Sequence, residues 1–234
     1  MADGEGARPK PRNADLPVRI ASAVVMLAVA IGALMAGDPW LDGFIAIVVT
    51  ATLVEFLRLL LKATPNLLPR VAAAVAGTAY IVTAGVVLAH LPLPMVVGVV
   101  GTVIAVDTFA YAFGRTLGGP KIAPSISPSK TWAGLLGAIV GASSWLALFI
   151  YFSARQVSGE TTLGFEAREI AIIIGLGTLL AVAAQSGDFL ESWLKRKAGV
   201  KDSSNLIPGH GGFFDRTDGM IPVLLVAGVG LGVL

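Results

Sequence analysis

The chain of 234 residues alternates between long apolar runs and short polar segments. Stretches without any Asp, Glu, Lys or Arg cover residues 20–37, 71–106, 131–154, 170–187 and 219–234. A helix that crosses the hydrocarbon core of a bilayer needs about 20 consecutive, mostly apolar residues. The longest charge-free stretch has room for nearly two such helices. The pattern therefore predicts an all-α, polytopic integral membrane protein.

Prolines divide the apolar runs into about seven predicted spans, and six to eight spans agree with the pattern. Proline lacks a backbone N–H and disfavours helix before it. The predicted spans are residues 20–36, 43–61, 71–89, 95–113, 132–152, 170–190 and 220–234. Residues 1–18 are polar and rich in Gly, Pro and Arg, which predicts a disordered tail. Residues 19–234 are predicted to form a single transmembrane domain.

The distribution of basic residues predicts the orientation, because Lys and Arg accumulate on the cytoplasmic side of membrane proteins. With the N-terminus in the cytoplasm, the cytoplasmic segments hold all but two of the 17 Lys and Arg residues. The two outside are Arg155 and Arg168. We therefore expect a cytoplasmic N-terminus in a multi-pass protein of the inner (cytoplasmic) membrane.

Composition and charge narrow the class further. Only 14% of the residues are charged, against about 25% in soluble domains, which excludes a soluble enzyme and a disordered chain. The absence of cysteine excludes thiol catalysis and Cys-ligated zinc. Ten of the 32 charged residues lie within residues 188–218, where acids and bases are mixed. That mixture argues against a nucleic-acid partner, which usually requires a basic face.

A first candidate segment runs from Asp107 to Thr131 on the predicted cytoplasmic side. Asp107 lies inside an apolar span, where a charge costs roughly 2.5–3.5 kcal/mol. It is expected to face a polar cavity or to pair with a basic residue of a neighbouring helix, and both alternatives stay open. Ser127, Lys130 and Thr131 offer hydroxyls, an amine and a helix N-terminus, which together suit an anion.

Two other features of the spans have structural interpretations. Glu55 lies one helical turn before Arg58, so we favour an ion pair between them. Gly137 and Gly141 form a small-residue motif that allows close packing of membrane helices.

The second candidate segment, residues 186–218, is predicted at the cytoplasmic face. If the sixth helix continues past Asp188, then Asp188, Glu191, Ser192 and Lys195 share one helix face. Carboxylates from two helix ends at this interface suit a hard cation such as Mg²⁺, and neighbouring basic side chains suit phosphates. Residues 208–212 (Pro-Gly-His-Gly-Gly) bring backbone N–H groups close to a ligand.

Taken singly, the parts of this segment also have ordinary explanations. Residues 195–197 are typical of a basic cytoplasmic boundary, and His210 is equally typical of a loop. Asp215 to Asp218 alone would suit an ion-paired helix cap. The whole constellation within 33 residues is harder to explain in this way.

The segment resembles the C-terminal hallmark of the phosphatidate cytidylyltransferases, also called CDP-diacylglycerol synthases. The resemblance fills every fixed position over residues 192–218 and extends upstream, where Asp107 and residues 127–131 also look like the family. The hallmark positions are Ser192, Leu194, Lys195, Arg196, Lys201, Asp202, Ser204, Ile207, Pro208, His210, Gly211, Gly212, Phe213, Asp215, Arg216, Thr217 and Asp218.

The resemblance implies that CTP and phosphatidate, taken from the cytoplasmic leaflet of membrane lipid, give CDP-diacylglycerol and pyrophosphate with Mg²⁺ as cofactor. It implies Asp188 and Asp215 as metal ligands, supported by Asp218, and it leaves open a second cation and a homodimer. Catalytic residues would be Asp188, Asp215, Lys195 and Ser192. The residues implied in substrate binding are Arg196, Lys201, Asp202, His210, Gly211, Arg216, Ser127, Lys130, Thr131 and Asp107.

Two alternatives stay open at this point. A CTP-dependent transferase acting on an isoprenoid or ether lipid phosphate would have the same headgroup site. A small ion-coupled transporter would instead place its charges near the midplane in broken helices. Most charged residues here lie at the ends of spans or in loops, which favours the enzyme.

Overall fold

A computed structural model describes residues 16–158 and 164–234. The helices are α1 (Leu16–Ala36), α2 (Trp40–Ala63), α3 (Leu67–His90), α4 (Leu93–Thr116), α5 (Trp132–Ser158), α6 (Ala167–Ala198), α7 (Phe214–Thr217) and α8 (Met220–Gly230). The strands β1 (Lys121–Ala123) and β2 (Ser127–Thr131) form an antiparallel hairpin. The prediction of a helical, polytopic membrane protein is confirmed.

Within the described residues, six helices are long and apolar enough to cross a membrane, and they coincide with the first six predicted spans. The seventh predicted span is instead α8, a helix of 11 residues. At 1.5 Å per residue α8 is roughly 16 Å long, about half of the bilayer core. Helix α1 begins at Leu16, so it includes the end of the segment predicted as a tail. The rest of that tail, residues 1–15, lies outside the described residues.

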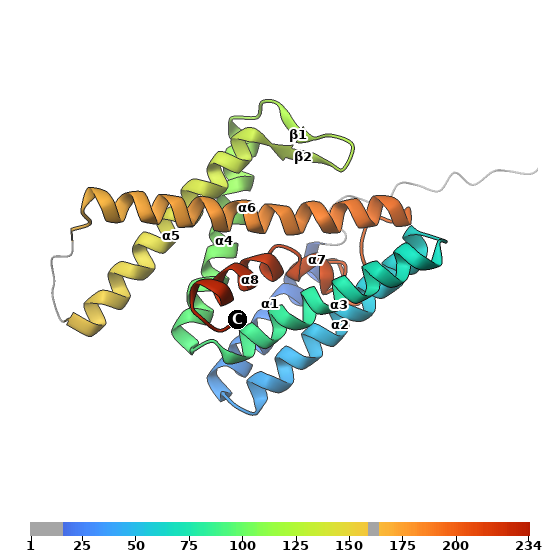
Figure 1. Cartoon of the computed structure of the whole chain (residues 1–234), viewed down its shortest axis with the longest axis horizontal. Coiled ribbons are helices and arrows are strands. Elements are labelled where there is room, and N and C mark those ends of the chain that lie inside the picture. Colours follow the sequence, from blue (N-terminus) through green and yellow to red (C-terminus); the bar gives the residue numbers. More distant parts are fainter. Residues whose placement is uncertain (1–15, 159–163) are drawn as a thin grey trace, which may run out of the picture.

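Helices α4 and α5 pack closely because of the small-residue motif of α5. A Cβ atom at Gly137 would collide with the carbonyl oxygen of Phe109, and one at Gly141 would collide with that of Ala105. The packing interpretation of the two glycines is confirmed. The β1–β2 hairpin lies beyond one end of this helix pair, where β2 leads directly into α5 (Figure 1).

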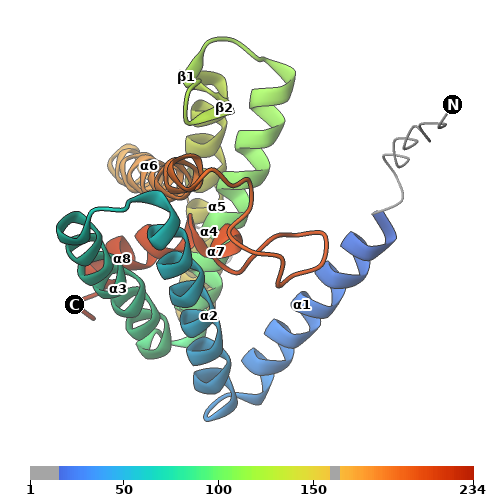
Figure 2. The ribbon, with the colours of Figure 1, turned by 90° about the vertical axis from the view of Figure 1, so that its right-hand side faces the viewer.

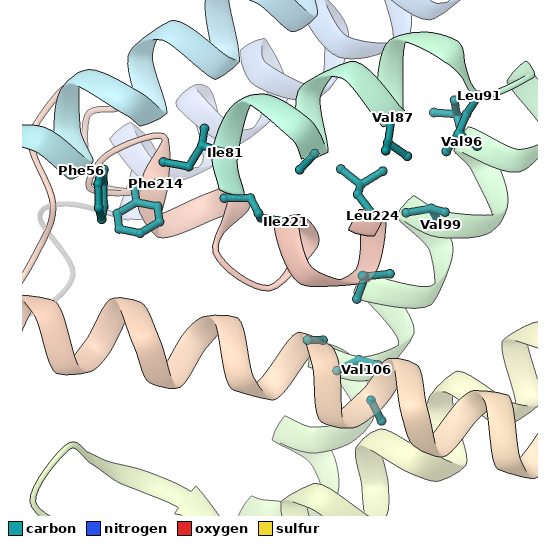
Figure 3. Packing of buried hydrophobic residues seen from close by; sticks show 14 of the residues in the cluster. Phe56, Ile81, Val87, Leu91, Val96, Val99, Val106, Phe214, Ile221 and Leu224 are labelled. Atoms are coloured by element: carbon teal, nitrogen blue, oxygen red, sulfur yellow. The ribbon is translucent and has the colours of Figure 1, made fainter. Parts of the chain in front are cut away.

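Helix α6 is the longest element, with 32 residues. It contacts α4 and α5 as well as α2 and α8, so it connects the α4–α5 pair to the other helices of the bundle (Figure 1). Short helix α8 lies inside this assembly and contacts α3, α4 and α6. Its Ile221 and Leu224 side chains are buried near Ile81 and Val87 of α3 (Figure 3). Protein contacts therefore cover α8 where a membrane span would meet lipid.

Helix α1 leans away from the other helices (Figure 2). Ala33 is its only described residue that is buried, and the helix packs on α2. Near the start of α1, the Ser22 hydroxyl lies 2.8 Å from the carbonyl oxygen of Pro208 and 2.8 Å from Nδ1 of His210. Helix α1 therefore also contacts the loop that precedes α7.

Candidate active site

A row of polar side chains follows one face of α6. Gln185, Asp188, Glu191 and Lys195 are spaced by three or four residues, which places them on the same side of a helix. The Lys195 ammonium lies 2.6 Å from Oε2 of Glu191 and 2.7 Å from Oδ1 of Asp215. The predicted common face is confirmed for Asp188, Glu191 and Lys195. Ser192 is half-buried on the same helix.

Asp215 is the most heavily hydrogen-bonded carboxylate of this region. Its Oδ1 pairs with Lys195, and its Oδ2 accepts bonds from the Ser203 N–H at 2.9 Å, the Ser203 hydroxyl at 2.8 Å and the Gly212 N–H at 2.8 Å. Burial alone would raise the pKa of Asp215. Hydrogen bonds from Glu191, Lys195, Gly212 and Ser203 outweigh burial and hold the pKa well below its ordinary value. Asp215 is therefore a firmly ionised anchor.

Glu55 on α2 holds the loop on the other side of Asp215. It is fully buried and accepts a bond from the Ser204 hydroxyl at 2.6 Å, while the Ser203 hydroxyl, which has one proton, lies 2.8 Å from both Glu55 and Asp215. Its oxygens also accept the backbone N–H groups of Phe213 at 3.1 Å and Phe214 at 2.8 Å. One carboxylate therefore ties to α2 both ends of the loop between α6 and α7 (residues 199–213), which we call the hallmark loop.

The predicted ion pair between Glu55 and Arg58 is wrong. Glu55 faces the inside of the bundle, where four donors surround it, whereas Arg58 is exposed. The sequence contained one signal for this role, namely a carboxylate within an apolar run, but its partners lie about 150 residues away in the chain. Spacing within one helix could not identify them.

A second polar group lies where α6 meets α4 and the β hairpin. The Lys130 ammonium donates to Oε1 of Gln185 at 2.8 Å and forms an ion pair with Asp188. These side chains line a cavity of about 180 Å³ that Asp107 and Tyr111 also line. Of the two alternatives for Asp107, the structure therefore shows the polar cavity. Gln185 was not predicted as a site residue.

Asp218 connects the two groups. Gly187 of α6 approaches the backbone carbonyl of Asp218 so closely that a Cβ atom there would collide with it. The next residue, Gly219, lies beside the carboxylate of Asp188. Burial, reinforced by the negative charge of Asp188, raises the pKa of Asp218 to about 8. The carboxyl groups of Asp188 and Asp218 are thus held close together, and basic side chains compensate only part of their charge.

This arrangement can be compared with the predicted magnesium ligands. No three His, Asp or Glu side chains within residues 16–158 and 164–234 form a ready-made metal site. Asp188 and Asp218 fit a hard divalent cation, because burial and the charge of Asp188 both raise the pKa of Asp218, and a bound cation would offset both effects. Both oxygens of Asp215 already accept bonds from protein donors. The metal-binding role of these residues stays a prediction.

The raised pKa of Asp218 predicts a pH-dependent stability. Its ordinary pKa is 3.8, so between about pH 4 and about pH 8 the folded protein keeps a proton that the unfolded chain has lost. Stability should therefore fall as the pH rises through this interval and level off above it. We expect a lower thermal unfolding midpoint at pH 9 than at pH 5 in detergent with a chelator present. Asp218→Asn should reduce that difference, and an unchanged difference would contradict the assignment.

The glycine-rich loop adopts a tight conformation around His210. Gly209 and Gly211 have φ angles of 75° and 82°, a region that favours glycine. Arg216 donates from two nitrogens to the carbonyl oxygen of His210, at 2.8 and 3.1 Å. His210 faces Ser22 of α1. His210, Gly211 and Arg216 therefore shape the loop beside Asp215.

The remaining predicted residues lie either in the β hairpin before α5 or at the exposed end of α6 and in the loop after it. Thr131 accepts the Gly134 N–H at 3.0 Å at the start of α5, which confirms the helix N-terminus predicted there, and Ser127 is buried in β2. Arg196 is exposed and reaches the carbonyl oxygen of Ile126 at 3.3 Å. Lys201 and Asp202 are exposed. The structure thus brings Asp107, Lys130, Asp188, Lys195, Asp215 and Asp218 around α6 and leaves Arg196, Lys201, Asp202 and Arg216 exposed at the edge.

Fold and site together define a polytopic helical membrane protein with acidic and basic side chains concentrated around one central helix. A sequence model of the family described as the cytidylyltransferase family matches residues 71–233. The chain belongs to this family. Glu55, Ser22 and the rest of α1 and α2 lie before the matched region.

Curated relatives include phosphatidate cytidylyltransferases of several bacteria. The chain is 43% identical over 115 residues to that of Brucella abortus, an alignment covering 49% of this chain and 38% of the relative. It is 42% identical over 116 residues to that of Haemophilus influenzae, covering 50% and 38%. It is 41% identical over 117 residues to that of Rickettsia bellii, covering 50% and 48%. The chain thus spans less than half the length of these relatives.

Proposed function

We propose that this protein transfers the cytidylyl group of CTP to phosphatidate, giving CDP-diacylglycerol and pyrophosphate. Family membership and the activity named for its relatives support the proposal. The observation that carries it is the set of lysines and carboxylates around α6, with Lys130 beside Asp188 and Lys195 between Glu191 and Asp215. Such a site offers cations for phosphate oxygens and acidic side chains to hold those cations in place.

The reaction makes modest demands on proton transfer. A phosphate oxygen of phosphatidate attacks the α-phosphorus of CTP, and the bond from that phosphorus to the bridging oxygen of the β-phosphate breaks. The attacking oxygen is already anionic, so no strong base is needed. The obstacle is repulsion between anions that must meet in line. Lys130 and Lys195 would reduce this repulsion and stabilise the charge on the departing pyrophosphate.

A divalent cation belongs to the same proposal. We assign its binding to Asp188 and Asp218, with Asp107 on the wall of the adjoining cavity. When bound, Mg²⁺ would neutralise phosphate oxygens and favour departure of pyrophosphate. Asp215 would act through Lys195, because its carboxylate fixes the position of that ammonium group.

The proposed site would face the cytoplasm of the inner membrane. The excess of Lys and Arg in the segments around it supports this orientation. CTP would then arrive from the cytosol, and phosphatidate would enter from the cytoplasmic leaflet.

The proposal is tested with purified protein in detergent supplied with Mg²⁺, CTP and phosphatidate. We expect pyrophosphate release and a CDP-lipid product identified by mass spectrometry. Parallel reactions with a polyprenyl phosphate and an ether-linked phosphatidate measure lipid selectivity. A preference for one of those lipids would replace phosphatidate as substrate, and no CDP-lipid from any of the three would refute the proposal.

Lys130→Ala provides a test of the second polar group. The change removes the cation that pairs with Asp188 and donates to Gln185. Loss of one preorganised donor that stabilises a transition state costs about 10²–10³ in rate, and we expect a fall in kcat of that order. Lys121→Ala is the matched control, because Lys121 is exposed in the same hairpin. Equal effects of both changes would show that Lys130 has no special role.

A further inference from the structure

A long apolar groove lies between α2, α3 and α6, with Phe214 of α7 at its inner wall. Its volume is about 700 Å³, within the range of about 300–1,000 Å³ typical of ligand pockets. The lining is apolar except for Thr64, Tyr80 and Lys197. We refer to this cavity as the α2/α3/α6 groove.

The groove has the depth of one membrane leaflet. Along α3 its lining extends from Pro69 to Ile81, which is roughly 18 Å at 1.5 Å per residue. The hydrocarbon core of a bilayer is about 30 Å thick, so a single leaflet contributes about half of that. An extended hydrocarbon chain of one leaflet therefore fits along the groove.

Positive charge lies at one end of the groove. Lys197, near the last residue of α6, lines it there together with Thr64, which follows α2. The guanidinium of Arg70 donates to the carbonyl oxygen of Thr64 at 2.6 and 3.0 Å, so a second cation is fixed at the same end. An apolar channel with cations only at its outer end complements a lipid with an anionic headgroup.

The groove also adjoins the candidate active site. Phe214 lines the groove and directly precedes Asp215, and Leu194 lines it directly before Lys195. The Phe214 ring packs edge-on against Phe56, with ring centroids 6.0 Å apart (Figure 3). The groove and the polar row therefore lie on neighbouring faces of α6, because consecutive helix residues point about 100° apart.

We propose that the α2/α3/α6 groove binds one acyl chain of the phosphatidate substrate and so orients its headgroup toward Lys195 and Asp215. This inference rests on the proposed function for the identity of the lipid. Lipid tails are as apolar as the groove, so a chain gains little hydrophobic energy on leaving the bilayer. The advantage is positional, because fixing the chain restricts where the phosphate can lie.

Photo-crosslinking of the full-length wild type tests occupancy without measuring activity. Phosphatidate with a diazirine in its acyl chain is incorporated at low mole fraction into phosphatidylcholine vesicles containing the protein. We expect labelled peptides from residues 73–81 and 190–194, with labelling reduced by unlabelled phosphatidate and not by added phosphatidylcholine. Labelling spread over α1 and α5, or insensitive to unlabelled phosphatidate, would overturn the proposal.

A substitution that fills the groove tests its effect on turnover. Ala76 lines the groove, whereas Ala79 is exposed on α3 outside it, so Ala76→Phe and Ala79→Phe add the same side chain at different places. With dioleoyl phosphatidate, Ala76→Phe should lower kcat/KM by about tenfold or more through misplacement of the headgroup. With dihexanoyl phosphatidate, whose chains are too short to fill the groove, the loss should be much smaller. Ala79→Phe should resemble wild type with both lipids.

The outcomes separate this inference from the proposed function. Equal losses with both lipids, or equal effects of the two variants, would overturn the role of the groove while wild-type turnover upheld the function. Specific crosslinking without any CDP-lipid from wild type would uphold the groove as a phosphatidate site and refute the proposed reaction.

Discussion

Replacing Asp215 by asparagine is expected to lower the rate of CDP-lipid formation by about 10³ while the protein stays folded. In the wild type, one oxygen of the Asp215 carboxylate accepts a hydrogen bond from the Lys195 ammonium, and the other accepts three from Ser203 and Gly212. An asparagine presents an NH₂ group in place of one oxygen, so either the ammonium or the loop donors lose their acceptor. Lys195 would then no longer be held between two acids. The measurement is kcat with CTP and phosphatidate at saturating Mg²⁺.

Asp42→Asn is the matched control for this change. Asp42 is an exposed acid in the first turn of α2, away from the hallmark loop. We expect its kcat and thermal midpoint to equal those of wild type. Full activity of Asp215→Asn would refute the role given to the Lys195–Asp215 pair. A loss of kcat accompanied by unfolding in detergent would instead assign Asp215 to stability alone.

Glu55→Gln is expected to weaken both the fold and the reaction. Its carboxylate accepts hydrogen bonds from the Ser204 hydroxyl and from the backbone N–H groups of residues 213 and 214, and it lies within hydrogen-bond distance of the Ser203 hydroxyl. Glutamine supplies only one acceptor oxygen, so at least one buried donor loses its partner, at a cost of about 1–3 kcal/mol for each such donor. We expect a clear fall in the thermal midpoint, together with a fall in kcat because the loop positions Asp215.

Arg58→Ala separates loop anchoring from a general effect on α2. Arg58 is exposed one turn from Glu55 on the same helix. An exposed substitution of this kind usually changes stability by less than about 0.5 kcal/mol, so its midpoint should match wild type. If Arg58→Ala lowered the midpoint as much as Glu55→Gln, the two would act as a pair, which would contradict the contacts described for Glu55.

The sequence pattern was sufficient for the membrane class and for the first six spans. Charge-free runs of membrane length leave few alternatives, because unpaired backbone groups in lipid require helices. The seventh run, residues 220–234, forms the 11-residue helix α8, and six long spans lie within the predicted range of six to eight. An apolar segment can be covered by other helices as well as by lipid, and α8 is covered by α3, α4 and α6. Composition alone does not distinguish these two environments.

The hallmark segment was also recognisable without the fold. The spacing of Asp188, Glu191 and Lys195 placed them on one face of α6, and the structure shows them there. Their partners were harder to predict. Lys130 reaches Asp188 from the β hairpin, Asp215 reaches Lys195 from α7, and Glu55 and Ser22 contact the following loop from helices remote in sequence. Local spacing contains no information about such contacts.

The sequence by itself therefore determined the membrane environment, the helical class and the segment rich in candidate chemistry, because hydropathy and periodicity are local properties of the chain. Only the tertiary structure decided how the charges are grouped. It placed Asp215 between Lys195 and the loop donors and brought Asp218 beside Asp188. It also showed that Glu55 binds the backbone at the end of the hallmark loop and that α2, α3 and α6 together line one apolar groove. Each of these depends on which helices pack together, and that choice is made by contacts between residues far apart in the chain.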